Sequence, residues 1–136
     1  MKKSAGILMY HLLNGGLRVL LVHSNGREDI EAWSIPKGEF DPSKESPEEA
    51  ATREVQEELG VTVPQDELIP LGECVYRNKG KRVYGFGWET ESEVPLSPDP
   101  REIALAQYFA LEQAKTKIHM AQKVFLDRLE SFVAGH

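Results

Sequence analysis

The chain has 136 residues, of which 40% are hydrophobic and 28% are charged, and its formal net charge is −6. This length and composition fit one globular domain with one core, so we expect residues 1–136 to form a single domain. The acidic balance and the lack of a basic tract argue against a large nucleic-acid surface. A small anionic ligand would need local compensation by a lysine, an arginine or a metal ion.

The cysteine count and the hydropathy of the chain favour a cytoplasmic protein. Cys74 is the only cysteine in the sequence, which excludes an internal disulfide and favours a reducing compartment. The first apolar run, in "MKKSAGILMYHLL", is short and lacks a small-residue cleavage site, so we interpret it as a strand and not as a signal peptide. No segment is long and apolar enough to span a bilayer, so we expect no membrane partner.

The first third of the chain predicts a hairpin, a short strand and loops. The apolar runs "AGILMYHLL" and "LRVLLVH" are joined by "NGG", and these three residues tolerate the positive φ of a tight hairpin turn. The polar stretch "SNGREDIEA" predicts a loop. "WSIP" predicts a short strand that Pro36 ends, and "KGEFDPSKE" predicts a second loop because Gly and Pro interrupt it.

The clearest helix is predicted over residues 47–59. Ser46 can serve as the N-cap, Pro47 suits the first helical position, and Glu49 completes a capping box. Gly60 stands where a helix commonly ends in a left-handed residue. Both ends of this helix are therefore marked by their own residue types.

The second half of the chain predicts three strands and a helix. "LIPLGECVYR" and "RVYGFGWETE" are strand patterns around the turn "NKGK", "VPLSPDP" is a loop, and "IALAQYFA" is a further strand. Residues 119–133 place apolar side chains at helical spacing, which predicts an amphipathic helix. Strands interleaved with helices predict an α/β (α+β) fold in which helices cover a mixed sheet.

The predicted helix over residues 47–59 carries crowded negative charge. Glu54, Glu57 and Glu58 share one sector because they lie three and four positions apart. Glu58 falls only about 60° from the centre of the apolar stripe, on the helical period. The stripe consists of Ala51, Val55 and Leu59. A solvated helix face is one explanation, but carboxylates beside a core favour a bound cation, and oxygen ligands favour Mg²⁺, Mn²⁺ or Ca²⁺.

At these residues the sequence resembles a known family. "GEFDPSKESPEEAATREVQEELGV" is similar to the Nudix box, G-x5-E-x7-R-E-U-x-E-E-x-G-U with U aliphatic. The part from Glu45 to Val61 matches in full, whereas six residues instead of five separate Gly38 from Glu45. We align the box from Arg53, because the extra residue falls in the predicted loop. The resemblance implies a Nudix-like α/β/α sandwich with a mixed sheet between helices.

The resemblance also implies a chemistry: metal-dependent hydrolysis of a diphosphate linkage in a nucleoside diphosphate joined to a group X, with Mg²⁺ or Mn²⁺ as cofactor. Glu54, Glu57 and Glu58, with Gly38, would be metal-binding residues, and Glu54 is the first choice for the general base. Glu57 is the other box glutamate expected at the reaction. Arg53 is expected to point away from the acidic sector and to pair with Glu45 as support for the site.

Further candidates lie outside the box. Glu102, just before the "YFAL" strand, is the candidate for an additional metal-binding carboxylate, with Glu89 and Glu91 as rivals. Lys37, in "PKGE", can contact a substrate phosphate as a point charge, or it can be a solvated lysine.

Aromatic and basic residues around "NKGKR" are candidates for substrate binding, namely Tyr76, Lys81 and Tyr84. By strand alternation, Tyr84, Phe86 and Trp88 share one face, which can be either a platform for a nucleobase or part of the core. The four histidines show no ligand spacing, and we assign them no role.

The box does not identify the substrate, because it acts on the diphosphate and not on X. We expect a dinucleoside polyphosphate of the diadenosine type, since "IPKGE" before the box resembles that in enzymes acting on such substrates. The alternatives are a housecleaning (d)NTP pyrophosphohydrolase and a non-catalytic, nucleotide-sensing Nudix-like domain. A homodimer is possible through the hairpins or the terminal helix.

Overall fold

The computed structural model describes residues 1–25 and 33–135. Most of the predicted polar loop "SNGREDIEA" lies outside these residues. Seven strands form one sheet: β1 (Lys2–Leu13), β2 (Gly16–Ser24), β3 (Trp33–Ser34), β4 (Lys37–Glu39), β5 (Ile69–Tyr76), β6 (Lys81–Glu89) and β7 (Ile103–Ala110). The α-helices are α1 (Pro47–Leu59), α2 (Leu111–Lys117) and α3 (Lys123–Ala134), and single 3-10 turns cover Gln65–Glu67, Arg77–Lys79 and Met120–Gln122.

The sheet is mixed, with one parallel pair at its centre. Its main path runs β3-β2-β1-β6-β5, while β4 pairs with β1 and β7 pairs with β2. β1 and β6 are parallel over nine residue pairs, and the other pairings are antiparallel. Residues 4–11 of β1 are all buried, which explains why this strand is a continuous apolar run and does not alternate.

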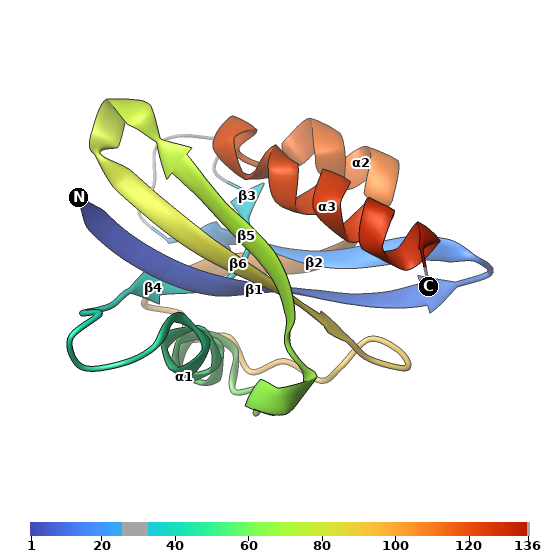
Figure 1. The fold of residues 1–136 in the computed structure, drawn as a ribbon. Coiled ribbons are helices and arrows are strands. Elements are labelled where there is room, and N and C mark those ends of the chain that lie inside the picture. The colour runs from blue at the N-terminus through green and yellow to red at the C-terminus, as the bar shows by residue number, and fades with distance from the viewer. Residues whose placement is uncertain (26–32, 136) are drawn as a thin grey trace.

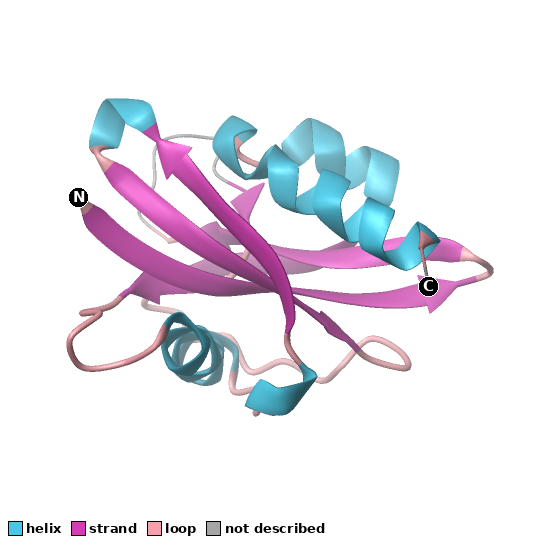
Figure 2. Cartoon of the chain, in the orientation of Figure 1, coloured by secondary structure: helices cyan, strands magenta, loops and turns pink. Residues whose placement is uncertain are grey.

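Helices cover both faces of the sheet, as Figures 1 and 2 show, with α1 on one side and α2 and α3 on the other. Two apolar clusters match these layers. One holds the buried residues of α1 together with Phe86, and the other holds those of α2 and α3 together with Tyr76. The predicted α/β/α sandwich with a mixed sheet is therefore confirmed.

The signals for turns and helix ends act as predicted. Asn14 and Gly15 adopt φ of 53° and 82° in the turn between β1 and β2. α1 spans the predicted residues, begins with the capping box of Ser46 and Glu49, and is followed by Gly60 at φ 69°. Ser46 Oγ accepts from the Glu49 amide at 3.1 Å, and a Glu49 oxygen accepts from the Ser46 amide at 2.9 Å.

Three short elements differ from the predictions. The predicted loop "KGEFDPSKE" begins with β4, which pairs with Ser4–Gly6 of β1 and is too short to show periodicity. α2 was not predicted, because its N-terminus has no side-chain cap. The helix predicted over residues 119–133 begins with the 3-10 turn Met120–Gln122, and α3 starts only at Lys123.

In the two described ranges, no helix is long and apolar enough to cross a membrane.

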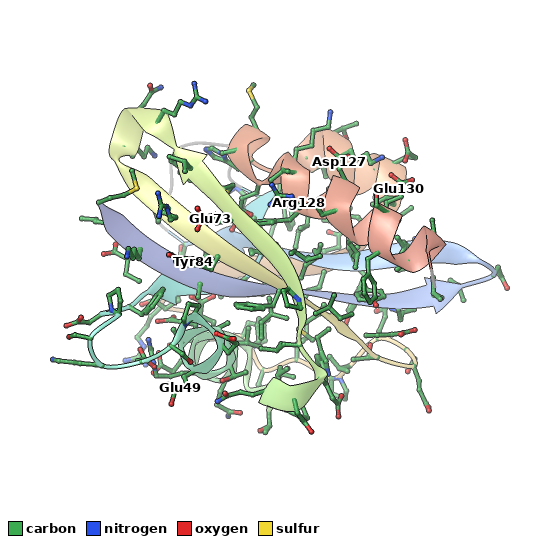
Figure 3. The ribbon with its side chains drawn as sticks, viewed as in Figure 1. Glu49, Glu73, Tyr84, Asp127, Arg128 and Glu130 are labelled. Carbon is green, nitrogen blue, oxygen red and sulfur yellow. The ribbon has the colours of Figure 1, made fainter. Side chains whose placement is uncertain are left out.

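Arg128 of α3 reaches the bulged end of β5, where its Nη1 donates to the carbonyls of Leu71 at 2.8 Å and Glu73 at 3.2 Å (Figure 3). This contact joins the C-terminal helix to the sheet edge.

Candidate active site

The carboxylates of α1 face a cavity of about 600 Å³, which we call the acidic cavity. Val55 and Leu59 are fully buried against the sheet, and the adjacent Glu58 is only 9% exposed. Helical phase thus places Glu58 beside the core and not opposite it, as the sequence predicts, whereas Glu54 is half-buried and Glu57 is exposed. The cavity is lined by Lys37, Gly38, Glu39, Glu54, Glu57, Glu58, Asp99, Arg101 and Glu102.

Gly38 has no room for a side chain. A Cβ built on it would overlap the carboxylate of Glu54. β4 therefore approaches α1 closely, and its backbone lies directly against a carboxylate of the cavity. The expected close approach at Gly38 is present, although one extra residue separates it from Glu45.

The loop after β6 brings another carboxylate to the cavity. The Ser97 amide donates to the carbonyl of Leu59, and the Asp99 amide to that of Glu58, both at 2.8 Å. These bonds attach the loop to the C-terminal end of α1, whose last carbonyls lack helical partners. Glu102 consequently lines the cavity, whereas its rivals Glu89 and Glu91 are not among the lining residues.

Burial and mutual repulsion change the acidity of these groups. Burial, followed by the charge of Glu54, raises the pKa of Glu58 to about 8, and the nearby Lys37 partly opposes this shift. Burial also raises the pKa of Glu54, although Arg53 counteracts it. Glu102 adds to both upward shifts. The cavity therefore holds more negative charge than its surroundings solvate well, which favours a bound cation.

Arg53 pairs with Glu45 as the resemblance predicts. Arg53 Nε lies 2.9 Å from Glu45 Oε2, and Nη2 lies 2.7 Å from Oε1, which is a bidentate pair. These hydrogen bonds hold the pKa of Glu45 below its ordinary value. The loop that carries the extra residue contains a turn in which the carbonyl of Asp41 accepts from the amides of Lys44 and Glu45.

The prediction that Arg53 points away from the acidic sector is wrong. Its Nη1 donates to Glu54 Oε1 at 2.9 Å and to Glu57 at 3.2 Å. A guanidinium has five donors in a planar fork, so it serves Glu45 on one side and the acidic sector on the other. Arg53 therefore neutralises part of the charge that a metal ion would neutralise.

The donor set suits a hard divalent cation. Carboxylates from α1 and the neighbouring loop, together with backbone oxygen near Gly38, are the ligand types that Mg²⁺ and Mn²⁺ accept. Among residues 1–25 and 33–135, no three acidic, histidine or cysteine side chains are already arranged around one ion. An ion bound in the cavity would share Glu54 and Glu57 with Arg53.

Lys37 precedes Gly38 in β4, and both residues line the acidic cavity. The charge of Lys37 lowers the pKa of Glu58, and it also opposes the burial that raises the pKa of Cys74. Lys37 therefore contributes a positive charge to the lining of the acidic cavity.

Tyr76 lies at a second cavity, of about 370 Å³, which we call the aromatic cavity. Its ring is stacked on the ring of His119, with centroids 4.3 Å apart and planes 3° from parallel. Lys81 Nζ lies 5.8 Å from the Tyr76 centroid, so Tyr76 and Lys81 are brought together. The lining residues are Val75, Tyr76, Arg77, Asn78, Lys79, His119, Met120 and Ala121.

Tyr84 does not join this group. It packs with the α1 cluster, where its ring meets Phe40 edge to face with centroids 6.0 Å apart. Phe86 is buried in the same cluster and Trp88 packs against it, so this aromatic stripe belongs to the core. Tyr84 and Tyr76 thus lie on opposite faces of the sheet and cannot form one slot.

Sequence reasoning missed several residues that line the cavities, among them Glu39, Asp99, Arg101 and His119. His119 carried no predicted role, because nothing in the sequence relates it to Tyr76 at a separation of 43 positions. Asp99 and Arg101 flank the acidic cavity from a loop without periodicity, and their side chains pair with each other at 3.2 Å. Only the tertiary contacts of that loop reveal them.

Comparison with family models identifies a NUDIX domain over residues 2–129. A Bacillus subtilis (strain 168) protein named "Putative 8-oxo-dGTP diphosphatase" is 47% identical over 49 residues, which cover 36% of this chain and 30% of that protein. This relative is therefore matched over less than a third of its own length.

Solved structures share the fold over the whole chain. A C. elegans Ap4A hydrolase in a binary complex is 25% identical, with a TM-score of 0.80 and coverage of 100% of both chains. The NUDIX domain of Shewanella oneidensis NrtR, in complex with ADP ribose, is 14% identical, with a TM-score of 0.76 over 96% of this chain and 87% of that one. The second likeness concerns the fold alone.

Proposed function

The chain belongs to the NUDIX family, and from this premise we propose that it is a pyrophosphohydrolase that cleaves dinucleoside polyphosphates of the diadenosine type. The observation that carries the proposal is the acidic cavity, in which Glu54, Glu57, Glu58 and Glu102 meet beside Gly38. Such carboxylates suit a site where a divalent ion and a polyphosphate are bound together.

Water would attack a phosphorus atom, forming a new P–O bond while the bridging P–O bond breaks and its electrons go to the leaving phosphate. Glu54, Glu57, Glu58 and Glu102, with the backbone at Gly38, would hold Mg²⁺ or Mn²⁺. When bound, the ion supplies neutralisation of phosphate charge and activation of water. Glu54 would accept the proton of the attacking water, and its raised pKa suits a general base. Arg53, anchored by Glu45, would orient Glu54 and Glu57.

The arrangement of Lys37 and the aromatic cavity supports a long substrate. A phosphate chain that leaves the acidic cavity would pass Lys37, which contributes a positive point charge. A nucleobase would then extend the stack of His119 on Tyr76, and Lys81 would lie beside that stack. The likeness to the C. elegans Ap4A hydrolase over the whole chain also supports this substrate class.

A (d)NTP pyrophosphohydrolase is the second candidate. Its support is the identity of 47% to the Bacillus subtilis protein, which is confined to 49 residues. The third candidate, a non-catalytic nucleotide sensor, is disfavoured because the glutamates of the box are all present and line the cavity.

The deciding experiment is a substrate panel with Mg²⁺, analysed by chromatography of the products. Diadenosine tetraphosphate should yield ATP and AMP, and it should be a better substrate than any NTP in kcat/KM. Release of pyrophosphate from NTPs as the faster reaction would replace the first candidate by the second. Tight nucleotide binding without turnover of either class would favour a sensor.

A further inference from the structure

Gln122 is a fully buried polar side chain that belongs to neither cavity. It ends the 3-10 turn Met120–Gln122, and its relative exposure is 0%. Its Oε1 accepts from the Ile35 amide at 2.9 Å, and its Nε2 donates to the Tyr76 hydroxyl at 2.6 Å. Since the backbone amide can only donate, the orientation of the side-chain amide is fixed by the chain itself.

The two hydrogen-bond partners of Gln122, Ile35 and Tyr76, each belong to a segment that lines one of the two cavities. Ile35 stands two residues before Lys37 and three before Gly38, which line the acidic cavity. The intervening Pro36 is held to β1, because its carbonyl accepts from the Ile7 amide at 3.1 Å. On the other side, Tyr76 carries the stacked ring of His119 in the aromatic cavity. One amide therefore joins a segment of the acidic cavity to the ring of the aromatic cavity.

The segment that contains Gln122 is itself fastened to the strand before Ile35. The His119 amide donates to the carbonyl of Trp33 at 2.8 Å, and Ile118 forms an isolated parallel bridge with Trp33. His119 Nδ1 accepts from the Ala121 amide at 3.1 Å, which caps the 3-10 turn. Backbone bonds thus hold His119, and a hydrogen bond from Gln122 holds the Tyr76 hydroxyl.

We propose that Gln122 is a positioning residue that sets the Tyr76–His119 stack relative to residues 35–38, and so matches the base-binding surface to the phosphate-binding one. This inference rests on the proposed function, because it assumes that a nucleobase binds at the stack. An apolar side chain of similar size would fill the same space but would fix neither partner. Loss of these bonds would let the stack shift, and a shift of about 1 Å in a positioning residue can cost on the order of 10²-fold in rate.

The experiment measures dissociation constants of two probes by titration calorimetry with Mg²⁺. AMP has a base and a phosphate, whereas inorganic tripolyphosphate has phosphates only. Gln122→Met removes both hydrogen bonds, and Tyr76→Phe removes only the hydroxyl and keeps the ring. Each variant should bind AMP about threefold to tenfold more weakly and tripolyphosphate as the parent does, and the double variant should be no weaker than the weaker single variant.

Several outcomes overturn the inference, and they separate it from the proposed function. Additive losses in the double variant, or equal losses for both probes, would show that Gln122 acts through general stability. Should Gln122→Met fail to fold, Tyr76→Phe still decides, because parental AMP binding by that variant contradicts the inference. Tyr76→Ala tests the base site itself: if it leaves AMP binding unchanged, the proposed base position fails. Weaker AMP binding by Tyr76→Ala with parental binding by Tyr76→Phe and Gln122→Met refutes only the role of Gln122.

Discussion

The acidic cavity and the aromatic cavity are built in different ways. Three carboxylates of the acidic cavity come from α1, within five consecutive positions, and the helical repeat alone brings them together. The aromatic cavity joins Tyr76 to His119, which are distant in sequence and meet only because the turn before α3 packs on β5. The comparison teaches that local sequence brings the carboxylates of α1 together, whereas the Tyr76–His119 stack depends on tertiary packing.

The largest effect is expected for the acidic cavity. Glu57→Gln removes one carboxylate charge at nearly constant volume, so kcat should fall about 10²-fold to 10⁴-fold with little change in melting temperature. Glu48→Gln is the matched control, because Glu48 is an exposed residue of the same helix that does not line the cavity. Steady-state rates with Mg²⁺ are measured for both variants and for the parent. Equal rates for Glu57→Gln and the parent would contradict the role of α1 in catalysis.

Gly38→Ala tests the backbone side of the same cavity. The new Cβ would overlap the Glu54 carboxylate, so either the carboxylate or β4 must move. Displacement of a reacting group by about 1 Å costs on the order of 10²-fold in rate, and we expect kcat to fall by that order. Gly16→Ala is the control, since a Cβ there meets only the carbonyl of Leu13 at 3.5 Å. A rate within twofold of the parent, with an unchanged melting curve, would argue against the close approach.

Residue patterns predicted most of the fold because each of these elements has its own local signal. The ends of α1 followed from Ser46, Pro47 and Gly60, and the first hairpin followed from Asn14 and Gly15. β4 and α2 lack such signals: β4 has three residues, and α2 has no capping side chain. Both exist because neighbouring strands and helices hold them, which is a tertiary effect.

In the candidate site, too, local patterns predicted some features and tertiary contacts created others. Helical phase predicted where Glu54, Glu57 and Glu58 point, but it could not show that Arg53 spans from Glu45 to the acidic sector. That contact depends on the length of the arginine side chain and on the path of the preceding loop. Likewise, alternation placed Tyr84 on a face of β6 without revealing that this face is opposite to that of Tyr76.

A smaller effect is expected at the aromatic cavity, and it should appear in KM. His119→Ala removes the ring that stacks on Tyr76. Loss of base stacking costs roughly 1–3 kcal/mol, so KM for diadenosine tetraphosphate should rise about tenfold while kcat changes little. His23→Ala is the control, because His23 is also half-buried and meets an aromatic ring, that of Trp33, but lines neither cavity. A loss confined to kcat would contradict the proposed division between the cavities.

The smallest effect concerns stability without metal. Burial raises the pKa of Glu58 from 4.5 to about 8, with Glu54 and Glu102 adding to the shift and Lys37 opposing it. The folded state therefore binds this proton more tightly than the unfolded state does, and stability falls as pH rises from 4.5 toward 8. In EDTA, the melting temperature should drop between about pH 5.5 and about pH 8.

The Glu58→Gln variant isolates this contribution, because it removes the titrating group and keeps the shape of the side chain. Its melting temperature should fall less over the same pH interval. The melting temperature of the exposed-site variant Glu48→Gln should fall as much as that of the parent. Under the proposed function Mg²⁺ would bind the ionised carboxylates, so adding it should stabilise the parent more at the higher pH. An identical pH profile for Glu58→Gln and the parent would mean that solvent, and not the core beside α1, surrounds Glu58. In that case the glutamates of α1 would form only a solvated helix face, and they would not form a distinct site beside the core.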